Sequence, residues 1–158
     1  MNGSKEILKK RIDKLDKHFV AIREYHSRIE SLMKRMDIYV PENFKELKVE
    51  ERAILEAYLK RFASIQDFLG AKVFPLLLEI RGIGAEKMSE VLEKIEKEGI
   101  IDSLDQWIEL REIRNELEHH YPDDIADALA DMRYCVEHLY VLESYYANSV
   151  RFVAGYLE

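Results

Sequence analysis

Residues 4–37, SKEILKKRIDKLDKHFVAIREYHSRIESLMKRMD, decide the fold class. Their apolar side chains recur at alternating intervals of four and three residues, at Leu8, Ile12, Leu15, Phe19, Ile22, Ile29, Met33 and Met36. This spacing predicts one long helix, with Ser4 as its N-cap and its end near Asp37. His26 takes one slot of the stripe. A helix with one apolar face must pack that face on partner helices, so the stripe indicates a helical bundle.

The same spacing continues along the chain. A second stripe runs from Leu55 to Ile80, and Pro75 inside it is expected to kink the helix without ending it. A short acidic helix is expected over residues 85–97, closed by Gly99. Ser103 and Gln106 form a capping-box pattern at the start of a helix that Pro122 ends. The last long helix is expected over residues 123–153.

Length and composition agree with one helical domain spanning residues 1–158. With 158 residues, 9 Gly and Pro in total and no strand–helix alternation, the chain is expected to be all-α. Short connections between long helices favour an antiparallel up-and-down bundle of four long helices plus one short helix. The single cysteine, Cys135, cannot form an internal disulfide, and a cytoplasmic location is expected. No uncharged stretch approaches the ~20 residues of a membrane helix.

The net charge of −7 bears on the possible partners. It argues against a protein that binds nucleic acid with its whole surface, so any such contact requires a local positive cluster. The turn Gly82-Ile83-Gly84 resembles a helix-hairpin-helix, which binds DNA phosphates through backbone N–H groups at a helix start. The glutamates that follow it would repel phosphate, which favours a simple inter-helix turn.

One segment near the end of the penultimate helix stands out, Arg111-Glu-Ile-Arg-Asn-Glu-Leu-Glu-His-His-Tyr-Pro122. On a helical wheel Arg114 falls between Trp107 and Leu110, inside the apolar stripe. An unpaired buried charge is costly, so Arg114 must be paired or must face a cleft or a subunit boundary. One interpretation is an ion pair between Arg114 and a glutamate, with solvent-facing histidines at the helix end. Because the segment has a single Glu-x-x-His pair, Glu116 and His119, a metal site is not expected.

The segment also resembles a known family. Arg114, four residues, His119, His120 and Tyr121 match the Arg-x4-His-x-Tyr signature of HepT-like members of the HEPN superfamily, and Asn115 is the polar residue common after the arginine. Residues 61–70, RFASIQDFLG, are similar to the second helix of that family. By architecture the resemblance covers most of the chain, but it is sharp only over residues 114–121.

The resemblance implies a ribonuclease activity, a homodimer and a protein antitoxin. HEPN proteins of this kind are metal-independent ribonucleases that need no cofactor, and two copies of the motif form one cleft across a homodimer. His119 would then act as acid and base and Arg114 would bind phosphate, with Asn115 orienting either one. Arg111 and His120 would add positive charge toward the RNA. A nucleotidyltransferase antitoxin would silence the toxin by attaching AMP to Tyr121.

Two alternatives remain open at this point. The first is a non-catalytic HEPN protein that only binds a nucleotidyltransferase. The second is a DNA-backbone binder that uses the Gly82-Ile83-Gly84 turn.

Overall fold

The computed structural model describes residues 2–121 and 123–158, and within them every regular element is helical. The elements are α1 (Asn2–Arg35), α2 (Pro41–Phe44), α3 (Val49–Phe68), the π-helical segment η1 (Leu69–Val73), α4 (Phe74–Ile80), α5 (Met88–Lys97), α6 (Leu104–His120), α7 (Ile125–Glu137), α8 (Leu139–Phe152) and α9 (Ala154–Leu157). The all-α prediction is therefore confirmed. None of these helices is long and apolar enough to cross a membrane.

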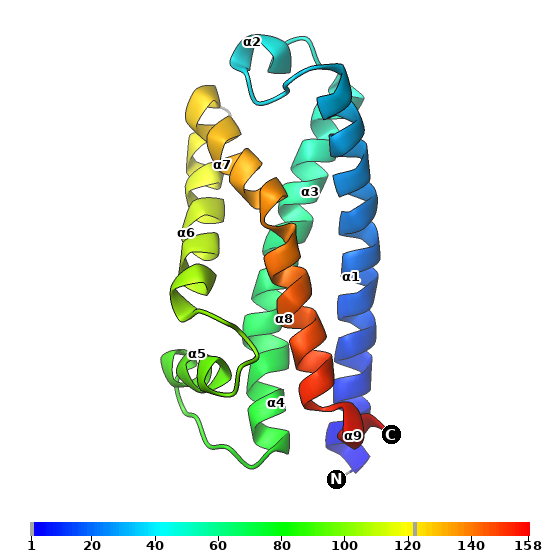
Figure 1. Ribbon diagram of the computed structural model, residues 1–158, viewed down its shortest axis with the longest axis vertical. Helices are drawn as coiled ribbons and strands as arrows, with labels where there is room; N and C mark the ends of the chain where they lie inside the picture. The colour runs from blue at the N-terminus through cyan, green and yellow to red at the C-terminus, as the bar shows by residue number, and fades with distance from the viewer. Residues whose placement is uncertain (1, 122) are drawn as a thin grey trace.

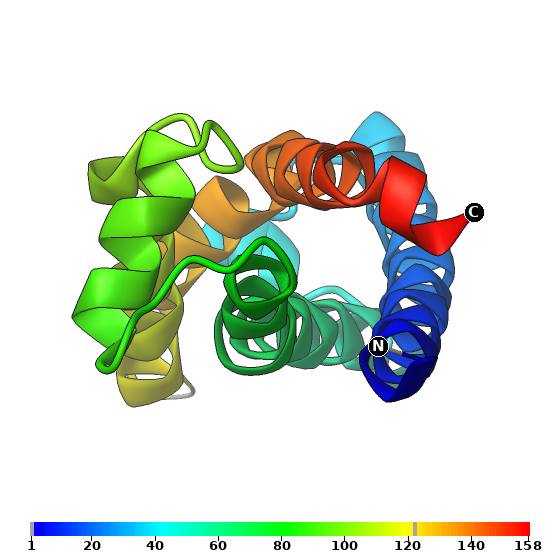
Figure 2. The same cartoon turned by 90° about the horizontal axis from the view of Figure 1, so that it is seen from below.

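The long elements lie side by side along one axis of the molecule (Figure 1). The chain follows α1 from one end to the other, passes α2, and returns through α3, η1 and α4. It then crosses through α5, runs back along α6, and returns again through α7 and α8. Seen from below, α1, α4 and α8 surround a common interior, with α5 and α6 to one side (Figure 2). The two chain ends meet at the same end of the molecule, where Lys5 Nζ donates to the backbone carbonyl of Glu158 at 2.5 Å.

The stripe that predicts α1 forms one side of the core. Leu8, Leu15, Phe19, Ile22 and Ile29 are completely buried, and the other members of the stripe are partly buried against them. The first helix begins at Asn2, so the prediction of Ser4 as its N-cap is wrong; the helical pattern simply extends upstream of that serine.

The histidine in the α1 stripe also has a structural role. Its ring lies 6.1 Å from the Tyr58 ring, and His26 Nε2 lies 3.2 Å from the Val136 carbonyl oxygen. The polar slot in the stripe is therefore filled by a side chain that bonds to a neighbouring helix.

The second stripe continues past its proline, as expected. Pro75 lies in the first turn of α4, and the preceding residues Leu69–Val73 adopt the wider π-helical turn. Proline has no backbone N–H, so a regular α-helical ladder cannot pass through it unchanged. The helix ends at Ile80, and Gly82 in the following turn has φ +72°, a conformation that favours glycine.

One predicted boundary and one predicted capping box need correction on the other side of the molecule. The short helix begins at Met88 instead of residue 85. Ser103 does cap α6 by accepting from the Gln106 N–H, but the Gln106 side chain donates to the Tyr134 hydroxyl at 2.8 Å and does not complete the capping box.

The last predicted helix is interrupted at His138, between α7 and α8. In an unbroken helix each carbonyl of residues 134–136 accepts from the N–H group four residues later, as the Tyr134 carbonyl still does from the His138 N–H at 3.0 Å. Here the Cys135 carbonyl accepts from the Tyr58 hydroxyl at 2.9 Å, and the Val136 carbonyl lies beside His26 Nε2. His138 Nδ1 lies 2.7 Å from the Tyr134 carbonyl oxygen. Side chains from α1, α3 and the break itself therefore bind the carbonyls at the point where the helix stops.

Candidate functional site

The candidate site is on α6, whose inner face is built by the same periodicity as the core. Trp107, Leu110 and Leu117 are buried, and Arg114 shares their face with only 7% of its surface exposed. The sequence prediction that Arg114 lies within the apolar stripe is therefore confirmed. A guanidinium at such a position needs partners from another helix.

Those partners come from α3. Arg114 Nη2 donates to Asp67 Oδ1 at 2.5 Å, and Nη1 donates to the Ala63 carbonyl at 3.1 Å. The third nitrogen, Nε, is buried without a hydrogen-bond partner among the described residues. The expected acidic partner therefore exists, but it is an aspartate and not a glutamate. Asp67 is the residue that sequence reasoning missed, although an arginine in an apolar stripe signals that such a partner exists.

The other polar residues of the motif lie outside this pair: Arg111 borders a small cavity together with Asp67, whereas Asn115 and His119 lie farther around the helix. Arg111, Asn115 and His119 are exposed, and their four-residue spacing places them along one side of α6. Arg114 and His119 are separated by about 140° around the helix axis, since each residue advances ~100°. One chain therefore does not bring the Arg114 guanidinium and the His119 imidazole together.

Tyr121 follows the last residue of α6 and lies on the Arg114 side. It is partly buried, and its ring meets the Phe44 ring edge-on, with the centroids 6.5 Å apart. Burial and, to a lesser extent, hydrogen bonding with Glu56 raise the pKa of the Tyr121 hydroxyl. The hydroxyl is thus protonated at neutral pH and lies near α3.

His120 is held by carboxylates. Its Nδ1 lies 3.1 Å from Asp131 Oδ2, and this hydrogen bond raises the pKa of His120. Ligand atoms of His120, Asp124 and Asp127 all lie within 4.8 Å of one another, and the Asp124 carboxylate raises the pKa of Asp127. Among the described residues, these three side chains form the group that could hold a cation. The positive charge expected from His120 is therefore offset locally by aspartates.

The Gly82-Ile83-Gly84 turn does not lie at a helix start. Helix α5 begins only at Met88, and the Lys94 side chain donates to the Gly84 carbonyl. The backbone N–H groups at the start of α5 are thus separated from the turn.

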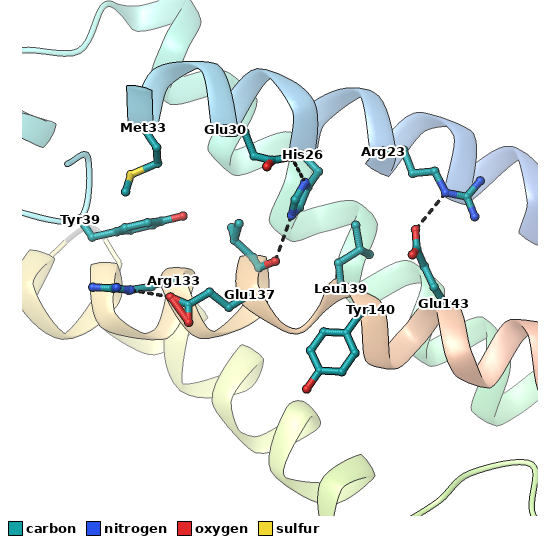
Figure 3. A pocket seen from close by; sticks show the side chains of 11 residues that line it. Arg23, His26, Glu30, Met33, Tyr39, Arg133, Glu137, Leu139, Tyr140 and Glu143 are labelled. Carbon is teal, nitrogen blue, oxygen red and sulfur yellow. Dashed lines mark hydrogen bonds and ion pairs between the residues drawn. The ribbon is translucent and has the colours of Figure 1, made fainter. Parts of the chain in front are cut away.

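A groove of about 670 Å³ lies elsewhere, between α1 and the α7–α8 break (Figure 3). The side chains that line it come mainly from α1, α7 and α8, and none belongs to the 111–122 segment. Its charged groups are already paired: Arg23 with Glu143 at 2.9 Å, and Arg133 with Glu137 at 2.6 Å. The His26 imidazole is likewise 2.9 Å from Glu30.

Comparison with known proteins gives no further assignment. No protein-family model, no curated protein and no solved structure matches this chain.

Proposed function

We propose that this chain is a metal-independent endoribonuclease of HEPN type, an antiparallel four-helix bundle that works as a homodimer and as the toxin of a toxin–antitoxin pair. The observation that carries the proposal is the contact between Arg114 and Asp67. It joins the two segments that resemble the family, residues 114–121 and residues 61–70, and it fixes Arg114 on two rigid helices. A functional side chain needs such support to keep its geometry.

The residue types suit cleavage of RNA by its own 2′-hydroxyl group. Attack of this hydroxyl on the adjacent phosphorus forms a new P–O bond and expels the 5′-oxygen of the next nucleotide. His119, exposed at the end of α6, moves the protons of these two oxygens. The Arg114 guanidinium stabilises the negative charge on the phosphate, whose oxygens compete with the Asp67 carboxylate for the same N–H donors.

A homodimer would bring together the Arg114 and His119 side chains that are separated within one chain. A C2 pair places the same face of α6 from both copies opposite each other, so that His119 of one copy faces the arginines of its partner. Arg111 and Asn115 lie on the exposed side of α6 and line the resulting cleft. Light scattering should give a mass of twice 18.7 kDa at micromolar concentration, and a monomer mass would contradict the dimer.

The activity is tested by RNA cleavage in the presence of EDTA. His119→Ala should lose activity by a factor of about 10² to 10⁴, the usual contribution of a general acid–base group. Arg114→Ala should lose a comparable factor. Glu24→Ala changes an exposed acidic residue on α1, outside the proposed cleft, and should retain activity. Circular dichroism and light scattering establish that each variant keeps its helices and its mass.

The antitoxin part of the proposal is tested at Tyr121. A nucleotidyltransferase that silences the toxin transfers AMP from ATP to the tyrosine oxygen and releases pyrophosphate. Tyr121→Phe lacks this oxygen, so it should cut RNA as well as the wild type but should escape inhibition. Inhibition of Tyr121→Phe equal to that of the wild type would contradict the modification.

A second candidate is a HEPN-type protein that binds a nucleotidyltransferase without cutting RNA. The observation that favours it is the charge around the motif: Arg114 is paired with Asp67, and His120 lies among Asp124, Asp127 and Asp131. This candidate predicts that the wild type and His119→Ala behave alike with every RNA tested.

A further inference from the structure

A group of basic side chains lies along the seam between α1 and the α3–η1 segment. These helices lie side by side, and α8 lies across the common interior from them, so the outer side of the seam faces solvent (Figure 2). Lys10 and Lys17 are exposed one helical turn to either side of Lys14 on α1. We call the whole group the basic seam; its members are Lys10, Arg11, Lys14, Lys17, Arg61 and Lys72.

Contacts between the helices place these side chains at one surface. Arg11 Nη1 donates to the Lys72 backbone carbonyl at 2.7 Å, which joins α1 to η1. Lys14 Nζ lies 5.4 Å from the centroid of the Phe68 ring at the end of α3. The cations of α1 therefore lie against the second half of α3 and the turn that follows it.

The centre of the basic seam holds like charges close together. Arg61 Nη1 donates to His18 Nδ1 at 2.9 Å. Burial, and then the positive charges of Arg61 and Lys14, lower the pKa of His18, so the imidazole is neutral at neutral pH. A guanidinium has five N–H donors, so these bonds leave donors of Arg61 and Arg11 available for an anion.

Carboxylates do not neutralise the basic seam. None of its six side chains takes part in an ion pair within residues 2–121 and 123–158. Asp13 is turned by ~100° from Lys14 around the axis of α1. Asp16 accepts from the Tyr146 hydroxyl of α8 at 3.4 Å, on the other side of α1. In a chain of net charge −7, such a concentration of unpaired cations indicates an anionic partner.

The shape of the basic seam fits a strand of phosphates better than a membrane surface. Helices that lie on a membrane present an apolar face to the lipid. The apolar face of α1 is buried in the core, and Ile7 is the one large exposed apolar side chain on its cationic face. The lysines follow a line instead, with rises of about 6 Å and about 4.5 Å between successive lysines along α1. A line of positive charge matches the backbone of a single strand.

We propose that the basic seam binds the phosphate backbone of a single RNA strand, outside the point of cleavage. The seam shares α3 with the candidate site, since Arg61 lies about 9 Å along the helix axis from Asp67, the partner of Arg114. A strand bound on the seam therefore continues across α3 toward α6. The inference rests on the proposed ribonuclease function for the identity of the strand. It adds to that function a surface that holds RNA away from the reacting phosphate.

The test is binding of the full-length protein to a fluorescent 2′-O-methyl RNA strand of about 16 nucleotides, measured by anisotropy at several salt concentrations. This strand lacks the attacking hydroxyl, so binding is measured without cleavage. Each phosphate that the protein neutralises on a single strand lowers the logarithm of the binding constant by about 0.7 per tenfold increase in salt. The slope of this salt dependence therefore reports how many phosphates the protein contacts.

Two triple variants with the same change in charge separate the basic seam from the rest of the surface. The seam variant carries three changes on α1: Lys10→Gln, Lys14→Gln and Lys17→Gln. The control variant changes three exposed lysines elsewhere: Lys34→Gln, Lys45→Gln and Lys97→Gln. The seam variant should reduce the slope by about 2 and the affinity at low salt by roughly 10²-fold. The control variant should keep the wild-type slope, and both should keep the wild-type circular dichroism.

Two competitors represent other polyanions. Unlabelled RNA should displace the labelled strand from the wild type more effectively than polyglutamate at the same concentration of charge. Equal displacement by polyglutamate would overturn RNA as the partner in favour of an acidic protein. Binding to phosphatidylserine vesicles that is as tight as RNA binding, and that the seam variant loses, would overturn it in favour of a membrane surface.

The outcomes also distinguish the basic seam from the nuclease. Equal salt slopes in the seam and control variants would overturn the seam, and cleavage of RNA by the same protein would leave the nuclease standing without it. A lower slope in the seam variant of a protein that cuts no RNA would support the seam and remove the nuclease. His119→Ala should bind the uncleavable strand as the wild type does, since His119 lies outside the seam.

Discussion

Removing the carboxylate of Asp67 should measurably destabilise the fold, because Arg114 has few other partners. In Asp67→Ala, Arg114 Nη1 still donates to the Ala63 carbonyl. Nη2 loses its only acceptor, so two guanidinium nitrogens, Nη2 and Nε, are then without a hydrogen-bond partner. Breaking a fully buried ion pair from one side costs about 3–5 kcal/mol. The Asp67 side chain is 65% exposed, so water can replace part of the lost interaction. We therefore expect a loss of about 1–2 kcal/mol in the free energy of unfolding.

Urea denaturation followed by circular dichroism and by Trp107 fluorescence measures this loss. For a domain of this size the loss corresponds to a decrease in Tm of about 2–8 °C. Asp67→Asn keeps the acceptor oxygen and should lose less than Asp67→Ala. Glu112→Gln, an exposed acid on α6, controls for the general effect of removing a negative charge.

The arginine side of the pair gives the stricter test. Arg114→Met removes the charge together with its need for a partner, so adding Asp67→Ala to it should cost almost nothing further. The two single losses should therefore fail to add in a double-mutant cycle. Our reasoning is wrong if Asp67→Ala has the same urea midpoint as the wild type. It is also wrong if the losses in unfolding free energy of the two single variants add fully in the double variant, because the Arg114–Asp67 contact then does not stabilise the protein.

Three further predictions concern other parts of the molecule. The Asp131 carboxylate raises the pKa of His120, so this pair stabilises the fold fully below the pKa of an unfolded histidine, about 6.5, and the stabilisation is lost as pH rises through the higher folded value. Urea midpoints measured from about pH 5.5 to about pH 8.5 should fall less in Asp131→Asn than in the wild type. Burial raises the pKa of the Cys135 thiol to about 12, so a thiol reagent should label the native protein far more slowly than a model thiol, and rapid native labelling would contradict this. Gly82 has φ +72° whereas Gly84 does not require a positive φ, so Gly82→Ala should cost about 1 kcal/mol in thermal denaturation and Gly84→Ala much less; equal effects would refute the conformational argument.

The α6 motif shows which features of a candidate site the helical periodicity of the sequence can predict. The position of Arg114 in an apolar stripe was predictable, because the 3.6-residue repeat alone assigns the faces of a helix. The same repeat gives the separation of Arg114 from His119. The repeat could not identify Asp67 as the partner, since that depends on how α3 is rotated and placed against α6. The small cavity beside them depends on the same placement and on the π-helical turn.

The sequence by itself determined that this protein is helical, because its apolar spacing recurs through nearly every segment and it contains only 9 glycines and prolines. It also determined which faces are buried, as the fully buried Leu15, Phe19 and Ile22 show. The break at His138 was decided only in the tertiary structure. No proline or glycine marks it, and it is stabilised by Tyr58 and His26, side chains from α3 and α1 that bind the carbonyls of Cys135 and Val136. Hydrogen bonds between segments distant in sequence leave no local signal, and for this reason they appear only when the helices are packed together.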